Sequence, residues 1–215
     1  VKHWLSPLSL ALALAAGPAA AQGSSYKIAY IDPLSGPFAN VGQLMLGHLQ
    51  FAVLDINAKG GLLGRPVDLI VEDSATTDSV AEAKAAKLVE QDKVDVILGG
   101  IYSSTRQAIK GPVVEGNKLY IYPEQYEGQE SHPLIFCTGP VPGQQVESMI
   151  PWLMRKTGVK KFYCPSADYI WPHILNQKLR AVVEVNGGSI VGEEYFPMDH
   201  MDYQETVDKI IASGA

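Results

Sequence analysis

The stretch from Tyr26 to Asp73, YKIAYIDPLSGPFANVGQLMLGHLQFAVLDINAKGGLLGRPVDLIVED, decides the fold. It begins with a strand-like run at Lys27–Asp32, and the turn-rich segment Pro33–Gly36 follows. Apolar residues then recur at roughly helical spacing until Gly60–Gly61 ends the pattern, at Leu44, Phe51 and Leu54. A second strand-like run occupies 66–73. The order strand, helix, strand predicts two parallel strands joined by a crossover helix.

The same alternation continues as far as Thr138. Ser79 and Glu82 have the spacing of a capping box, which predicts a helix start. A buried stripe is expected on that helix at Ala81, Ala85, Leu88 and Val89. Strands are predicted at 94–98 and 118–122, with a helix at 105–115 between them. We therefore predict an α/β lobe over 22–138, with a parallel sheet and helices on both faces.

A Gly- and Pro-rich segment, Gly139–Gly143, interrupts this pattern, and we interpret it as a hinge crossing into a second α/β lobe at 144–215. That lobe is expected to hold helices at 144–157, at 172–186 and from 203, and strands at 160–164 and 189–196. Two strands are fewer than the usual ~4–6 in a sheet. The sequence stops after a helix with a capping Gly, where a strand should follow. We expect the second lobe to be truncated.

Residues 1–21 predict a cleaved signal peptide, because a basic start precedes a short apolar run and small residues. Export to the periplasm follows from that prediction. Disulfides form in this compartment, so Cys137 and Cys164 are either paired or two buried thiols, and both alternatives stay open.

Composition excludes several function classes. The 215 residues are 47% hydrophobic with a formal net charge of −6, so no basic surface suggests nucleic acid. No nucleophile elbow, zinc-protease helix or phosphate loop occurs, and the five His do not sit at paired ligand positions. We predict no enzyme, no metal and no cofactor.

Loops at the carboxyl ends of parallel strands form the ligand sites of such folds. Here these loops are 32–37, 101–106, 123–128 and 166–171. Three of the four combine aromatic rings with small polar side chains, which suits a small polar ligand. Ser103, Ser104 and Thr105 sit where a helix should start, and could hold a carboxylate or carbonyl oxygen. The alternative is that one of them only caps the helix.

Three segments carry a resemblance to a known family: Tyr122–Gly128 (YPEQYEG), Thr138–Gln145 (TGPVPGQQ) and Asp168–Pro172 (DYIWP). The segments 31–36 and 55–65 also match the broader group. Over 26–215 the chain resembles type I periplasmic binding proteins of the branched-chain amino acid, amide and urea group. It is most similar to the amide receptor and urea-binding subfamily.

The resemblance implies a two-lobed clamp that closes on an amide, urea or amino-acid-like solute and delivers it to an ABC-type membrane permease. It also implies the ligand-binding residues Tyr102, Ser103, Ser104, Tyr122, Glu124, Gln125, Tyr169 and Trp171. The alternative function is a ligand-sensing receptor or regulator domain on the same fold, against which the signal peptide argues.

Glu124 departs from the family pattern, which has a small or neutral residue there. A carboxylate that faces a closed cleft is costly unless it meets a cation or a donor, so an inward Glu124 favours ammonium, amidinium or N–H-rich ligands. The alternative is that Glu124 turns outward to solvent. Asp168 is either a ligand group of the second lobe or the cap of the following helix.

Overall fold

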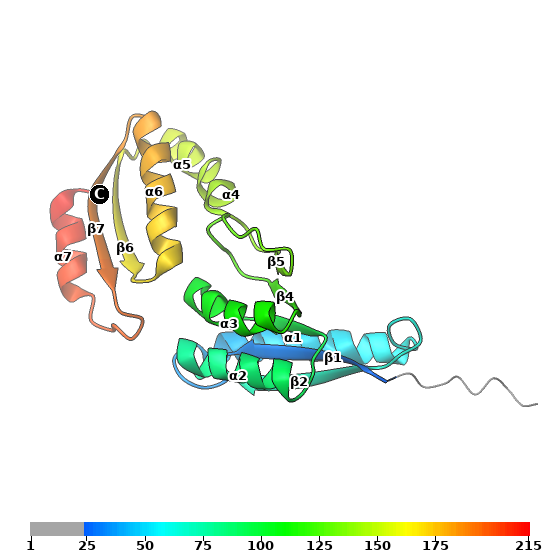
Figure 1. Cartoon of the computed structure of the whole chain (residues 1–215). Coiled ribbons are helices and arrows are strands. Elements are labelled where there is room, and N and C mark those ends of the chain that lie inside the picture. The colour runs from blue at the N-terminus through cyan, green and yellow to red at the C-terminus, as the bar shows by residue number, and fades with distance from the viewer. Residues whose placement is uncertain (1–23) are drawn as a thin grey trace, which may run out of the picture.

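The computed structural model describes residues 24–215, and the expected signal peptide at 1–21 lies outside the described residues. Two units follow one another along the chain (Figure 1). Lobe one is built on a five-stranded sheet of order β2-β1-β3-β4-β5, and lobe two on a two-stranded sheet of β6 and β7. All neighbouring strands are parallel. The predicted α/β fold class is confirmed.

Lobe one alternates strand and helix up to its fourth strand. Its elements are β1 (Tyr26–Asp32), α1 (Ala39–Ala58), β2 (Val67–Asp73), α2 (Asp78–Glu90), β3 (Val96–Gly99), α3 (Ser103–Glu115), β4 (Leu119–Tyr122) and β5 (Ile135–Cys137). Every predicted strand and helix of this lobe is present, with bounds that differ by one or two residues at most ends.

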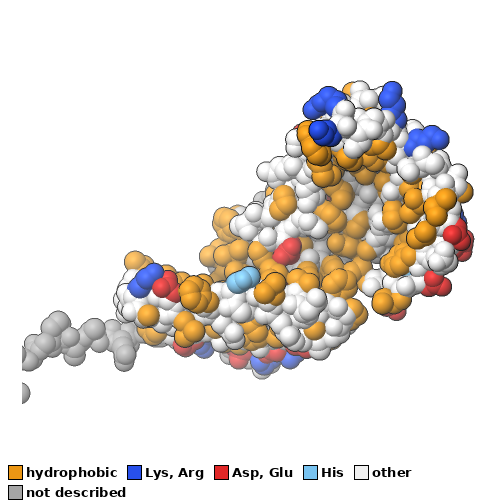
Figure 2. All heavy atoms as spheres, turned by 180° about the vertical axis from the view of Figure 1, so that it is seen from behind, with side chains coloured by type: hydrophobic (Ala, Val, Ile, Leu, Met, Phe, Trp, Pro, Cys, Tyr) orange, Lys and Arg blue, Asp and Glu red, His pale blue; other side chains and the backbone are white. Residues whose placement is uncertain are grey.

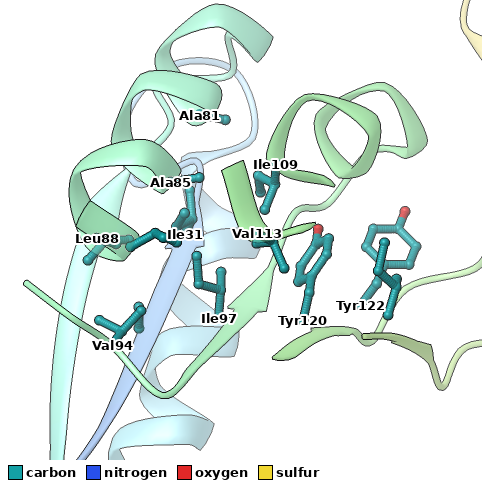
Figure 3. Close-up of a cluster of buried hydrophobic side chains, with 13 residues drawn as sticks. Ile31, Ala81, Ala85, Leu88, Val94, Ile97, Ile109, Val113, Tyr120 and Tyr122 are labelled. Carbon is teal, nitrogen blue, oxygen red and sulfur yellow. The ribbon is translucent and has the colours of Figure 1, made fainter. Parts of the chain in front are cut away.

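The main core lies between the sheet and the pair α2 and α3, which pack against each other on one face of the sheet. Figure 3 shows Leu88 and Ile109 of these helices beside Ile97 and Tyr120 of the strands. Ala81, Ala85, Leu88 and Val89 are all buried, so the predicted stripe on α2 is confirmed.

The capping box at Ser79 is not formed. The N-cap of α2 is Thr77, whose backbone is extended, and Ser79 lies inside the helix. Thr77 makes no side-chain cap, and its hydroxyl donates instead to the carbonyl of Ala75 at 3.1 Å.

Helix α1 packs on β1 through a small contact: the hydroxyl of Tyr30 donates to the carbonyl of Gly42 at 2.9 Å. A Cβ at Gly42 would lie 2.1 Å from the carbonyl oxygen of Pro33, so only glycine fits this approach.

The apolar residues that predicted helix α1 are exposed: Leu44 by 64%, Phe51 by 73% and Leu54 by 70%. In Figure 2, apolar side chains gather over the hollowed middle of the visible face.

Lobe two begins with two short helices. Its elements are α4 (Pro142–Val146), α5 (Met149–Thr157), β6 (Lys161–Ala167), α6 (Ile170–Val185), β7 (Ser189–Phe196) and α7 (Gln204–Ser213). The single helix predicted over 144–157 is wrong, because the chain leaves helical structure at Glu147–Ser148. Its core joins α4 and α5 to α6 through Val146, Ile150 and Val183.

Both cysteines are free: Cys137 is partly buried in β5 and Cys164 is buried in β6. The sequence left open a disulfide or two thiols, and the structure has two thiols. No helix within residues 24–215 combines the length and apolar character needed to cross a membrane.

Candidate functional site

The lobes meet through the loops that follow strands. Tyr102, which comes after β3, directs its ring edge-on to that of Tyr169, which comes after β6, with 5.4 Å between ring centroids. The ring of Phe38, in the loop after β1, lies 5.1 Å from Tyr102 in the same type of contact. Three loops from strand ends thus converge between the lobes, as expected for parallel sheets.

A pocket of about 250 Å³ opens beside this aromatic contact. Lobe one lines it with Thr76, Thr77, Asp78, Tyr102 and Ser104, and lobe two with Tyr169 and Met198. The lining therefore combines two aromatic rings with hydroxyl groups and one carboxylate. Three predicted site residues, Tyr102, Ser104 and Tyr169, are brought together here.

Tyr102 has the most unusual environment of the lining residues. It is only 9% exposed, and its buried hydroxyl has no hydrogen-bond partner within residues 24–215. Burial raises the pKa of Tyr102, and Tyr169, Asp32 and Asp78 raise it further. A buried hydroxyl without a partner costs about 1–3 kcal/mol. This hydroxyl can therefore donate to a solute at no loss of an internal bond.

The hydroxyl residues at the start of α3 differ in availability. Ser103 is buried, and its Oγ accepts a hydrogen bond from Nη1 of Arg106 at 3.3 Å. The Thr105 hydroxyl donates to Asp78 Oδ1 at 2.7 Å. Ser104 is the one that lines the pocket. None of the three is the N-cap, which is Tyr102.

Arg106 joins α3 to the loop after β4. Its Nη2 donates to Oε2 of Glu127 at 2.6 Å, and their side chains are 2% and 6% exposed. The guanidinium also lies 4.8 Å from the ring centroid of Tyr122. This buried pair neutralises itself, so Arg106 adds little positive charge to the space between the lobes.

Tyr122 and Gln125 are engaged inside the structure. Tyr122 is fully buried, and its hydroxyl lies 3.3 Å from the carbonyl of Gln125, to which it donates. The Oε1 of Gln125 accepts from Nε2 of Gln145 at 3.0 Å, which ties this loop to α4. Their contact with a solute stays a prediction.

Glu124 is partly buried, and burial raises its pKa without an opposing cation. Its charge adds to the effect of burial in raising the pKa of Tyr169 and of Asp32. Asp32 is fully buried; its Oδ1 accepts from the amide of Gly100 at 3.0 Å, and Oδ2 has no partner among the described residues. Burial raises the pKa of Asp32 to about 6.

Lobe two contributes two aromatic residues from the start of α6. Tyr169 is the N-cap residue, and burial followed by Glu127 and Glu124 raises its pKa to about 12. Trp171 lies in the first turn, with its buried Nε1 unpartnered in the described part of the chain. Asp168 does not cap the helix and instead contacts Nε2 of His173 at 2.9 Å.

Sequence reasoning missed Phe38, Asp78 and Met198. Asp78 was hidden because the helix start was placed at Ser79, and Met198 follows β7, whose loop was not counted among the ligand loops. No cluster of metal-binding side chains occurs in residues 24–215.

The chain matches a family described as periplasmic binding protein over residues 25–215. It is 36% identical to the Leu/Ile/Val-binding protein of Escherichia coli (strain K12) over 81 residues, 38% of this chain and 22% of that protein.

Two solved structures share the fold. A periplasmic binding protein from Burkholderia mallei superimposes with a TM-score of 0.78 at 24% identity, covering 89% of this chain and 52% of that one. The branched-chain amino acid transporter substrate binding protein LivJ from Streptococcus pneumoniae, in complex with isoleucine, gives 0.78 at 23% identity, over 87% and 54%. The chain thus spans about half the length of these structures.

Proposed function

Because the chain belongs to the periplasmic binding protein family, we propose that it is the substrate-binding component of an ABC-type transporter and holds a small polar solute between its lobes. Family members such as the Leu/Ile/Val-binding protein bind solutes and are not enzymes. The expected site of action is the periplasm, consistent with the predicted signal peptide at 1–21.

The interlobe pocket carries this proposal. Its volume of about 250 Å³ lies just under the usual ~300–1,000 Å³ of small-molecule pockets, which points to a solute of few heavy atoms. Tyr102 and Tyr169 supply walls from opposite lobes, and the unpartnered Tyr102 hydroxyl supplies a donor. Ser104 adds a second hydroxyl.

The solute we propose is an amide, a urea or an amino-acid-like compound. Segments Tyr122–Gly128 and Asp168–Pro172, which resemble amide- and urea-binding proteins, support the first two. The relatives named for leucine, isoleucine and valine support the third. Ser103, Tyr122, Gln125 and Trp171 are proposed to complete the site around the lining residues.

Capture follows from the placement of the pocket between two lobes. Solute contacts lobe one first, at Tyr102 and Ser104, and Tyr169 then closes over it by rotation near Gly139–Gly143. Contacts made to both lobes favour the closed state, because an open clamp offers only half of them. The closed form is the one offered to the permease.

Thermal unfolding of the 215-residue chain tests this function. The panel holds urea, acetamide, the branched-chain amino acids and guanidinium-type compounds at millimolar concentration. A solute at 100 times its Kd raises the free energy of unfolding by about 2.7 kcal/mol. We expect one chemical class to raise the melting temperature. A folded chain whose melting temperature no member raises would contradict the proposal.

A further inference from the structure

The charged side chain in the lining of the interlobe pocket is a carboxylate. Asp78 lines the pocket itself, and the lining contains no Lys, Arg or His. Burial is the main cause that raises the pKa of both phenols; the charges of Asp32 and Asp78 raise that of Tyr102 further, and those of Glu127 and Glu124 raise that of Tyr169. Asp78 therefore lies in the lining, and the charges of Asp32 and Glu124 add to the negative field at the two rings.

No described cation compensates these three groups. Thr105 donates to Asp78, and the Gly100 amide donates to Asp32, so their known partners are neutral. Arg106 is paired with Glu127 at 2.6 Å.

The partial positive charges of the nearby helix N-termini offset only part of the negative charge of the carboxylates. The first turns of α2, α3 and α6 lie beside the pocket, because Asp78, Ser104 and Tyr169 belong to them or cap them. Each N-terminus carries about half a positive charge, so three ends supply about one and a half. Three carboxylates supply up to three negative charges, and the balance remains negative.

One buried polar atom without a partner points to a ligand rather than to a solvated acidic surface. The Tyr102 hydroxyl belongs to a pocket-lining side chain that is 9% exposed, and it has no partner among the described residues. Buried polar atoms in proteins normally have partners, so this exception needs an explanation.

We propose, building on the proposed solute-binding function, that the pocket selects a small planar cation of the amidinium or guanidinium class over its neutral amide or urea counterpart. Such a cation has the shape of an amide or a urea, presents N–H groups to carboxylates and offers a flat face to Tyr102 and Tyr169. A solute with a carboxylate would be repelled by the carboxylate of Asp78. The Thr105 hydroxyl would not offer it a hydrogen bond, because this hydroxyl already donates to Asp78.

Calorimetric titration of the 215-residue chain with two isosteric pairs tests the charge preference. The pairs are guanidinium chloride with urea, and acetamidinium chloride with acetamide, at equal ionic strength and at concentrations far below those that unfold proteins. We expect each cation to bind at least about tenfold more tightly than its neutral partner. We also expect Glu124→Gln to reduce that ratio severalfold.

Glu115→Gln is the matched control. It removes the same charge at the exposed C-terminal end of α3, about 18 Å along the helix from Ser103, and should leave the ratio unchanged. Binding of urea or acetamide as tight as, or tighter than, that of its matched cation overturns the charge inference but leaves the solute-binding function standing. Absence of binding by every compound in a folded chain contradicts the function, and the inference falls with it.

Discussion

The ring of Tyr102 in lobe one lies edge-on to the ring of Tyr169 in lobe two, with centroids 5.4 Å apart and planes at 75°. Each residue immediately precedes a helix, α3 or α6, so the contact brings the N-termini of two helices from different lobes together. A solute at this contact touches both lobes, which is what capture by closure requires.

Tyr102→Phe separates a binding role from a structural one. The variant removes a buried hydroxyl without a partner in the described residues, so the free protein should be as stable as wild type or more stable, by up to about 1–3 kcal/mol. Solute affinity should fall. Chemical unfolding and calorimetric titration give the two quantities.

Tyr120→Phe is the matched control for that variant. Its hydroxyl is also buried, but donates to the carbonyl of Gly99 at 3.0 Å. Its loss should cost about 1 kcal/mol of stability and leave affinity unchanged. The opposite pattern in the two variants would remove Tyr102 from the site.

Arg106→Met should destabilise the protein by about 3–5 kcal/mol, because it leaves the buried Glu127 carboxylate uncompensated. The double variant Arg106→Met with Glu127→Gln should recover much of this loss, since it leaves no uncompensated charge in the interior. Thermal unfolding without added solute measures both. Equal losses in the single and double variants would show that the ion pair is not the cause.

Gly139→Ala should displace the loop that carries Glu124. An added Cβ would lie 2.1 Å from the carbonyl oxygen of Glu124 and 2.7 Å from the amide nitrogen of Gln125, so backbone must move. We expect a loss of about 1–3 kcal/mol in stability together with weaker solute binding. Gly111→Ala is the control, because no atom lies within 4 Å of its added Cβ on α3. Loss of affinity in the Gly111 variant as well would argue against a specific effect at Glu124.

Asp32 should make stability depend on pH. Its pKa rises from 3.8 when unfolded to about 6 when folded, so the folded state binds the extra proton between these values. The contribution of Asp32 to the free energy of unfolding is therefore fully present below about pH 4. It is lost as the pH rises through 6, which lowers the free energy of unfolding by about 3 kcal/mol. Asp32→Asn keeps an oxygen for the Gly100 amide and lacks this dependence. The stability of the variant minus that of wild type should grow from pH 4 to pH 7, and a constant difference would contradict the assignment.

The fold follows from the sequence where local patterns suffice. Strand β7 has the predicted bounds 189–196, and the stripe on α2 is buried as predicted. Periodicity also predicted α1, but its apolar residues Leu44, Phe51 and Leu54 are exposed. Spacing identifies a helix and its apolar face, whereas what covers that face depends on tertiary packing.

The site was predictable as a set of loops but not as a set of side-chain directions. Strand order places Tyr102 and Tyr169 at ligand loops, and the structure brings them into contact. Tyr122, a predicted ligand residue, lies in the core cluster with Tyr120, and its contact with a solute stays a proposal. The period of two along β4 puts both residues on one face of the sheet, and this signal was available in the sequence.

The most direct test of the account is calorimetric titration of wild type, Tyr169→Ala and Trp152→Ala with the panel compound that raises the melting temperature most. Trp152 is 56% exposed on α5 and takes no part in the pocket lining, so it controls for loss of an aromatic ring. We predict one-to-one binding in wild type and in Trp152→Ala, and affinity about tenfold weaker in Tyr169→Ala, because a desolvated cation–ring contact contributes up to about 2 kcal/mol. Equal affinity in all three folded proteins would contradict solute capture at the Tyr102–Tyr169 contact.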